Sequence, residues 1–330
     1  MRENTKKYGT GLGLVTAVAT LVLGLILQAS PADAGTSGGS RVTTRAAGSL
    51  NTRSMSEVNA AYWSQYANLQ TLPIGWIGGS LLGCLPGLSS ASSNAATLTA
   101  MNYVRSLAGL APVTLSPSLN AGAQAAALMM SANGALSHSP SSSWKCYSSA
   151  GAQAASRSNL ALSYPNITSG QIVDLYMDDP GSTNAAVGHR RWMLNPFVTA
   201  VGTGSTDTAN ALTVIGPTSS ARPNPRWVGW PTAGYFPNAM EPGGRWSLSS
   251  GQRNVSFARA HVRVFYGSTR LAVHQYRVEN GYAQPTLVWQ MPSSFPKTGT
   301  FRVVVKNIKK KGKRHPVHTS YTVNLFTPTP

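Results

Sequence analysis

Two histidines in the first two thirds of the chain are the side chains best suited to chemistry. His138 follows Leu136-Ser137, and His189 lies in Gly188-His189-Arg190-Arg191. Two neutral imidazoles that the fold brings together, with a carboxylate and a water, would form an open site for a divalent metal. Asp178 and Asp179, at the end of a predicted helix, are candidate carboxylate partners. The alternative, which the spacing alone favours, is that both histidines hydrogen-bond to backbone where loops meet helices.

A second pattern belongs to another class of chemistry. Ser142-x-x-Lys145, Tyr164-x-Asn166 and Lys297-Thr298-Gly299 occur in the order used by penicillin-binding serine enzymes. That mechanism needs its serine at a helix start, one turn before the lysine, whereas Ser142 lies in a serine-rich stretch. We therefore interpret these short patterns as chance matches in a chain rich in serine and threonine.

Helices are predicted around the histidines by capping residues and apolar periodicity. The first begins at Ser93 and ends at Gly109, the second runs from Ser116 to Asn133, and the third begins near Ser169. Residues 135–168 read as a serine-rich loop, and short strands are predicted at 200–202 and 212–215. This order of elements predicts an α/β or α+β layer structure.

The chain changes character near residue 216, where a proline-rich stretch with Trp227, Trp230 and Trp246 begins. We interpret the tryptophans as core residues of a second domain, with stacking on sugar as the alternative. Alternating apolar and β-branched runs then predict strands of a small antiparallel β-sandwich at 262–266, 271–275, 286–290, 301–305 and 321–326. The predicted divisions are a signal at 1–34, a flexible lead-in and N-terminal extension at 35–89, a first domain at 90–216 and a basic β-sandwich domain at 217–330.

The N-terminus has the order of an export signal. Basic residues precede an apolar stretch from Leu12 to Leu27, and Ala32-Asp33-Ala34 follows as a cleavage site. An uncleaved single-span anchor is the alternative, and no later stretch is apolar and long enough to span a membrane. Export predicts that the only cysteines, Cys84 and Cys146, form a disulfide, with metal ligation by this pair as the lesser interpretation.

The formal net charge of +18 is divided unequally between the two domains. Residues 35–216 carry eight basic and five acidic residues, whereas residues 217–330 carry sixteen basic and two acidic residues. A basic run at residues 306–314 contains Lys306, Lys309, Lys310, Lys311, Lys313 and Arg314. It predicts either a solvated hairpin tip or a site for an anionic cell-envelope polymer or lipid, and nucleic acid is a less suitable partner for an exported protein.

An ordered set of motifs over residues 90–216 resembles the CAP superfamily, which comprises cysteine-rich secretory, antigen 5 and pathogenesis-related proteins and their exported bacterial relatives. The motifs are Met101-Asn102-Tyr103-Val104-Arg105, Gly134-Ala135-Leu136-Ser137-His138, Ser158-Asn159-Leu160-Ala161, Tyr176-Met177-Asp178-Asp179-Pro180-Gly181, Gly188-His189-Arg190-Arg191 and Asn195-Pro196. The resemblance implies an α-β-α sandwich with a central cleft, so the fold class that we predict is α+β, with the antiparallel β-sandwich after it.

The resemblance also implies a site. Two histidines and two acidic residues of the family face one another across the cleft and can hold zinc or another divalent cation, which assigns His138, His189 and Asp179 or Asp178 to it. The chain has Ser158 where the family commonly has glutamate. This replacement removes a charge and the strongest candidate base, and it weakens both metal binding and hydrolysis.

Two functions follow as hypotheses. The first is a secreted or envelope-associated binding module with a cleft at His138 and His189, kept near the envelope by the basic domain. The second is a metal- or histidine-dependent hydrolase in the same cleft. A structural wall component with neither ligand nor activity is a third class. Sequence patterns assign no ligand and no oligomeric state.

Overall fold

The computed structural model describes residues 50–181, 184–222 and 224–330, so the predicted signal at 1–34 lies outside the described residues. The first part of the described chain is built on a four-stranded sheet of order β1-β3-β4-β2. Its strands are β1 (Thr114–Leu115), β2 (Ser158–Leu162), β3 (Ala200–Ser205) and β4 (Ala209–Thr213). Only β1 and β3 pair in parallel.

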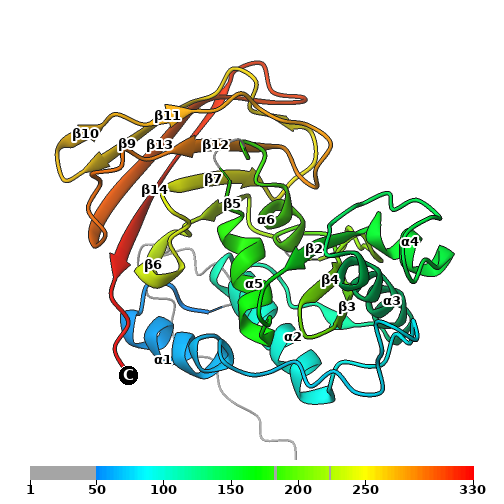
Figure 1. The fold of residues 1–330 in the computed structure, drawn as a ribbon. Coiled ribbons are helices and arrows are strands. Elements are labelled where there is room, and N and C mark those ends of the chain that lie inside the picture. The colour runs from blue at the N-terminus through cyan, green and yellow to red at the C-terminus, as the bar shows by residue number, and fades with distance from the viewer. Residues whose placement is uncertain (1–49, 182–183, 223) are drawn as a thin grey trace, which may run out of the picture. The chain divides into compact units, whose positions relative to one another are not determined.

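Helices cover both faces of this sheet (Figure 1). Against one face lie α3 (Pro117–Asn133) and α4 (Ser149–Ala155), whose small side chains form an alanine-rich core with Ala209 and Ala211 of β4. The core of the other face includes α2 (Ala91–Leu107) and α5 (Ser169–Asp178), together with Val201 and Leu212. Because side chains alternate along a strand, β4 serves both cores. The result is an α-β-α sandwich, as the resemblance implied.

The three predicted helices are present as α2, α3 and α5. Ser90 caps α2 by accepting from the Ser93 backbone N–H, and Gly134 follows α3 in the left-handed conformation that glycine tolerates. The predicted loop at 135–168 also contains α4 and β2. The sequence did not predict them because neither shows apolar periodicity: α4 packs through alanines, and β2 is buried on both faces.

Within the predicted N-terminal extension, the described residues include a helix. Helix α1 (Met55–Gln65) is followed by η1 (Ala67–Leu69), and Val58 and Ala61 of α1 are buried. The Tyr235 backbone N–H donates to the Thr52 carbonyl at 2.6 Å, and Asn59 exchanges hydrogen bonds with Thr329. From Thr52 onward, the extension is therefore part of the packed structure and contacts the C-terminal domain.

The C-terminal part contains two further sheets. One has the order β10-β9-β13-β14-β6 with β8 beside β13, and the other has the order β11-β12-β7-β5. Their strands are β5 (Trp227–Trp230), β6 (Gly234–Pro237), β7 (Arg245–Ser250), β8 (Val255–Ser256), β9 (His261–Tyr266), β10 (Thr269–Leu271), β11 (His274–Gln275), β12 (Thr286–Gln290), β13 (Gly299–Lys310) and β14 (Val317–Phe326). Short 3-10 helix η2 (Asn238–Met240) follows β6.

These sheets form the β-sandwich that the alternating runs predict, with one parallel pair, β6 and β14, among antiparallel ones. Trp230 and Trp246 are fully buried, as predicted for core residues, and so is Trp289. Trp227, the third tryptophan predicted to lie in the core, is half-buried. The proline-rich stretch, in which the sequence predicts no strand, contains β5, β6 and β7.

The structure contains the predicted disulfide and locates the basic run. Cys84 and Cys146 form a disulfide, with their Cα atoms 4.9 Å apart. The basic run spans the end of β13 and the turn into β14: Lys306, Lys309 and Lys310 lie in the strand, whereas Lys311, Lys313 and Arg314 lie in the turn. Within the described ranges, no helix is long and apolar enough to cross a membrane.

Candidate functional site

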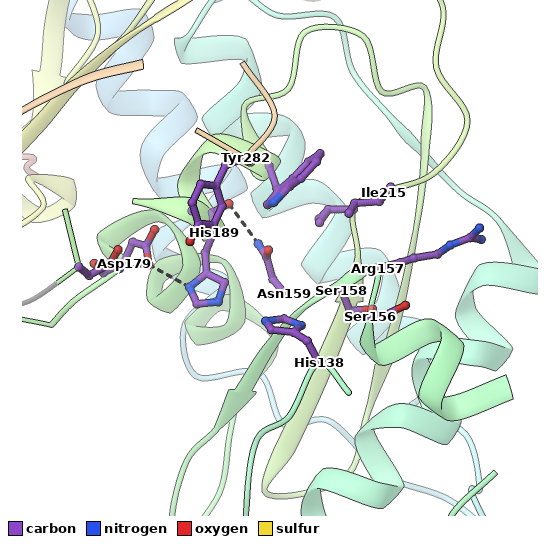
Figure 2. A pocket seen from close by; sticks show the side chains of 14 residues that line it. His138, Ser156, Arg157, Ser158, Asn159, Asp179, His189, Ile215 and Tyr282 are labelled. Carbon is purple, nitrogen blue, oxygen red and sulfur yellow. Dashed lines mark hydrogen bonds and ion pairs between the residues drawn. The ribbon is translucent and has the colours of Figure 1, made fainter. Parts of the chain in front are cut away.

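His138 and His189 line one pocket of about 470 Å³. His138 lies in the loop after α3, and His189 is the second residue of α6 (Gly188–Met193). Asp179, which follows α5, together with residues of β2 and of the loop after β4, completes most of the wall, and Figure 2 shows both imidazoles beside the same cavity. The tertiary structure thus brings together the two histidines that the sequence analysis paired.

Each imidazole has its Nδ1 atom engaged. Nδ1 of His138 lies 2.9 Å from the carbonyl oxygen of Ala155, at the end of α4. A carbonyl oxygen can only accept, so Nδ1 of His138 carries the hydrogen and Nε2 of the neutral ring keeps its lone pair. Nδ1 of His189 lies 2.9 Å from Oδ1 of Asp179. Both rings are therefore oriented through Nδ1, which is the usual arrangement for histidines that act through Nε2.

Asp179 is buried and serves several donors at once. Besides His189, it accepts from the Asn184 side chain at 2.7 Å and from the Arg190 backbone N–H at 3.3 Å. Burial alone would raise the pKa of Asp179, but hydrogen bonding and attraction to His189, with a smaller contribution from Arg190, outweigh it and leave the pKa below its ordinary value. The carboxylate is thus ionised and committed to orienting His189.

Strand β2 contributes Ser158 and Asn159 to the pocket, at the position where the sequence departs from the family pattern. The Ser158 hydroxyl donates to the Ala154 carbonyl at 2.7 Å and lies 2.9 Å from the Thr213 hydroxyl. Ser158 is 5% exposed. Its hydroxyl therefore joins β2 to α4 and β4. The Asn159 side chain donates to the His189 carbonyl at 3.1 Å and ties α6 to β2.

The structure separates Asp178 from the two histidines. Asp178 lines a different pocket, together with Tyr66, Asp174 and Glu241. Burial raises the pKa of Asp178, Arg190 and Arg245 lower it, and Asp179 raises it, with a net upward shift. Of the two adjacent aspartates that sequence reasoning could not distinguish, Asp179 is the one beside His189.

The β-sandwich also contributes to the pocket, through Gly281 and Tyr282 of the loop before β12. The Tyr282 ring lies so close to α6 that a Cβ atom on Gly188 would be 2.6 Å from it. Arg191 places its guanidinium 5.2 Å from the centre of that ring and donates to the carbonyls of Gln284, Tyr282 and Glu279. Sequence reasoning missed Tyr282, because nothing in the aperiodic stretch around it marks a contact with the first domain.

The donor set limits what metal the pocket can hold. No group of three or more His, Cys, Asp or Glu side chains is arranged for a metal ion within the described residues. The two free Nε2 atoms fit as nitrogen ligands, whereas Asp179 is engaged with His189 and Ser158 supplies no charge. At most two protein ligands, the Nε2 atoms of His138 and His189, would therefore be offered to a metal in this pocket.

The other predicted patterns lie elsewhere. Ser142 lines a surface pocket beside the disulfide, and Lys297 of the second domain pairs with Glu241 at 3.5 Å. The serine-enzyme pattern is therefore not assembled around one cavity in the described structure. Among the basic residues, Lys310 donates to the Gln252 side chain at 2.6 Å, and the turn residues Lys311, Lys313 and Arg314 are exposed.

A comparison with curated proteins finds no match to the chain. Among solved structures, PcoC, a methionine-rich copper resistance protein from Escherichia coli, aligns with 17% identity over 30% of this chain and 93% of its own. The TM-score is 0.23, which does not establish a common fold. The model of the cysteine-rich secretory protein family, CAP, matches residues 98–215. This range contains most of α2, the other sandwich helices, the four-stranded sheet, His138 and His189, so residues 98–215 form a CAP domain.

Proposed function

We propose that the protein is an exported binding module whose cleft takes a ligand at His138 and His189, and whose basic β-sandwich attaches it to anionic cell-envelope material. One observation carries the cleft assignment: both histidines line one pocket, each oriented through Nδ1. Their Nε2 atoms are thus available to a ligand, either as hydrogen-bonding groups or as metal ligands.

A divalent cation such as zinc fits this pair as a weakly held group. His138 and His189 would hold it, and Asp179 would orient His189 and increase its basicity. When bound, the metal would supply Lewis acidity toward an oxygen of the ligand. Because a carboxylate ligand is missing at Ser158, we expect weaker zinc binding than a site with three protein ligands would show.

Zinc binding by the full chain tests the cleft assignment. We expect isothermal titration to show one zinc site in the protein, with at least a tenfold lower affinity in His138→Ala and in His189→Ala, because each change removes one of two protein ligands. His274→Ala, which removes an exposed histidine of β11, is the matched control and keeps the affinity. Equal affinity in all four proteins contradicts the metal assignment.

Attachment to the envelope is supported by the charge of residues 217–330 and by the export signal that the N-terminal residues predict. Clustered cations attract polyanions, and salt weakens that attraction. Retention of the full chain on immobilised polyphosphate should fall steeply as salt increases. Deletion of the second domain is a poor test, because Tyr282 lines the cleft and β6 contacts the N-terminal extension. Point variants keep these contacts.

A hydrolase in the same cleft is the second candidate function, and the contact between His189 and Asp179 favours it. A buried carboxylate on Nδ1 orients a histidine for general-base chemistry at Nε2. Against it stands Ser158, in place of an acidic group. If the chain is a hydrolase weakened by this replacement, Ser158→Glu should increase the hydrolysis of a simple ester such as p-nitrophenyl acetate, and His189→Ala should abolish the increase. No change in either variant contradicts the hydrolase.

A further inference from the structure

The outer face of the sheet that contains β9, β10, β13 and β14 carries a set of cations of which only Lys306 belongs to the basic run. Register places Arg302 of β13 opposite Phe265 of β9, which in turn lies opposite Arg270 of β10. Along the same face, Arg263 lies opposite Val304, and Lys306 lies opposite His261. Their neighbours in sequence, such as Val264 and Val303, are buried in the sandwich core, so these residues point outward.

We call Arg263, Arg270, Arg302 and Lys306 the cationic face. All four are exposed. The sequences of β9, β10, β13 and β14 contain no acidic residue. The ion pairs found in the described structure join His189 to Asp179 and Lys297 to Glu241, so none of them neutralises this face. Four positive charges are therefore presented to solvent by adjacent strands, without an acidic partner in that part of the chain.

The central arginine of this face is held in place. The Arg302 guanidinium lies 4.2 Å from the centre of the Phe265 ring, a distance suited to stacking. Phe265 is half-buried and has Arg270 as its cross-strand partner on the other side. Stacking reduces the conformational freedom that a flexible cation loses when it binds an anion. The face is thus more ordered than a set of mobile surface lysines.

We propose that the cationic face binds an extended polyanionic polymer that lies flat across the strands. Side chains on one face of a strand repeat every ~6.7 Å, and the register places Arg302 of β13, Arg263 of β9 and Lys306 of β13 at three successive levels of the face. These cations can therefore meet successive anionic groups of a linear chain. Ser320 and Thr322 of β14 lie beside Val304 and Arg302 and add hydroxyl groups. This inference rests on the attachment part of the proposed function, and it moves the contact from the β13–β14 turn to the sheet face.

A polymer suits this surface better than a lipid bilayer does. Stable binding at a membrane surface combines cations with apolar side chains that enter the acyl region. Among the described residues, the large apolar side chains that are exposed include Tyr266 near this face, but its register partner is the buried Phe301, on the inward side. The outward apolar residues Phe265 and Val304 are only partly exposed. On the outward side of these described strands, no fully exposed apolar side chain accompanies the cations.

Two triple variants of the full chain test the assignment with matched charge. The face variant carries Arg263→Ala, Arg270→Ala and Arg302→Ala, and the turn variant carries Lys311→Ala, Lys313→Ala and Arg314→Ala. Both lose three positive charges, so non-specific attraction falls equally. With polyphosphate in solution at fixed salt, we expect the dissociation constant to rise about tenfold or more in the face variant, and less than threefold in the turn variant. Thermal unfolding of both variants checks that each is folded.

The other outcomes separate this inference from the attachment that it rests on. Equal weakening in both variants overturns the face and leaves attachment by net charge. Weakening in the turn variant alone also overturns it and assigns attachment to the turn. No binding of polyphosphate by the unmodified chain contradicts both. Phosphatidylglycerol vesicles form the second arm, and tighter binding to vesicles than to polymer, lost in the face variant, overturns the polymer assignment in favour of a membrane.

If substitution at three positions unfolds the sandwich, the single variant Arg302→Lys tests whether the cationic face binds polyphosphate. Lysine keeps the charge, but it lacks the planar guanidinium that stacks on Phe265 and grips an anion with two donors. We expect a two- to fivefold weaker affinity for polyphosphate, roughly the loss of one ordered contact. Lys313→Arg is the reverse control in the turn and leaves the affinity within twofold. An unchanged affinity in Arg302→Lys contradicts the role of the ordered arginine.

Discussion

Arginine has opposite roles in the two domains. In the CAP domain, Arg105, Arg190 and Arg191 are at most 4% exposed, and each donates to backbone carbonyls. In the β-sandwich, Arg263 and Arg302 are exposed, on strands without acidic residues. Burial lowers the pKa of Arg105 to about 9 and that of Arg190 to about 10, because burial disfavours the charged form.

This difference shows why net charge is a poor guide to what a basic protein binds. A guanidinium group carries several N–H donors in one plane, so a buried arginine can donate hydrogen bonds to carbonyl groups at the ends of helices and loops. Arg105 does so by joining the end of α2 to the carbonyls of Met193 and Asn195. Such an arginine contributes to stability, whereas an exposed arginine without an acidic partner contributes to the external field. The following predictions test this division.

Arg190→Ala should give the largest effect. Arg190 donates to the carbonyls of Met177, Asp178 and Arg245, and its charge lies near Asp178 and Asp179. Its loss leaves buried acceptors without donors and removes a buried cation beside two carboxyl groups, so we expect the free energy of unfolding to fall by about 3 kcal/mol or more. Urea denaturation measures the loss, with the exposed Arg277→Ala as control. A loss below about 1 kcal/mol would contradict the structural role.

Arg191→Ala should have a smaller and more local effect. The side chain joins α6 to the loop that carries Tyr282, through carbonyl contacts and ring stacking. We expect the free energy of unfolding to fall by about 2 kcal/mol. Amide hydrogen exchange should accelerate in residues 279–284 while β13 stays protected. Unchanged exchange in that loop would show that Arg191 does not hold the cleft wall.

Asp179→Asn tests the charge of the cleft through pH. The pKa of Asp179 lies below its ordinary value of 3.8, so ionisation stabilises the fold above that value. This stabilisation is lost as pH falls through the lowered pKa. Asparagine is neutral throughout, so the variant should be about 1 kcal/mol less stable at pH 7, with a gap that narrows below about pH 4. Urea denaturation at pH 7 and pH 3 measures both gaps, and a constant gap would rule out a charge effect.

Arg302→Ala should have the smallest effect on folding. Its side chain is exposed and stacks on the Phe265 ring. We expect the free energy of unfolding to change by no more than about 0.5 kcal/mol, as for most surface substitutions. Urea denaturation again measures the change. A loss comparable to that of Arg190→Ala would break the contrast between the two domains.

Local patterns were sufficient for the long elements. Apolar periodicity and capping residues predicted α2, α3 and α5, and alternation predicted strands at β9, β12, β13 and β14. Local patterns failed at β5, β6 and β7, where proline and glycine interrupt the runs. These strands are stabilised by pairing with distant partners: β7 pairs with β12, and β6 pairs with β14. Pairing of this kind leaves little trace in a short window of sequence.

The cleft was predicted in part. Motif order related His138 to His189, although the stretch between them contains two helices and a strand. Motif order did not distinguish Asp178 from Asp179. The two side chains point in different directions at the end of α5, and the direction of each depends on the backbone conformation there. In the structure, Asp179 has a positive φ of 50° at the end of α5, which turns the chain toward α6. Tyr282 could not be predicted at all, since the contact depends on how the second domain lies against Gly188.

The sequence by itself determined the class of the protein: residue types and their order set the helices, the disulfide partners, the CAP motifs and the concentration of charge after residue 216. Tertiary structure decided which charges are available. It buries Arg190 and Arg191 as donors to backbone, commits Asp179 to His189, and leaves Arg263 and Arg302 in solvent. The physical reason is that the cost of burying a charge, and the partners that offset this cost, depend on segments far apart along the chain.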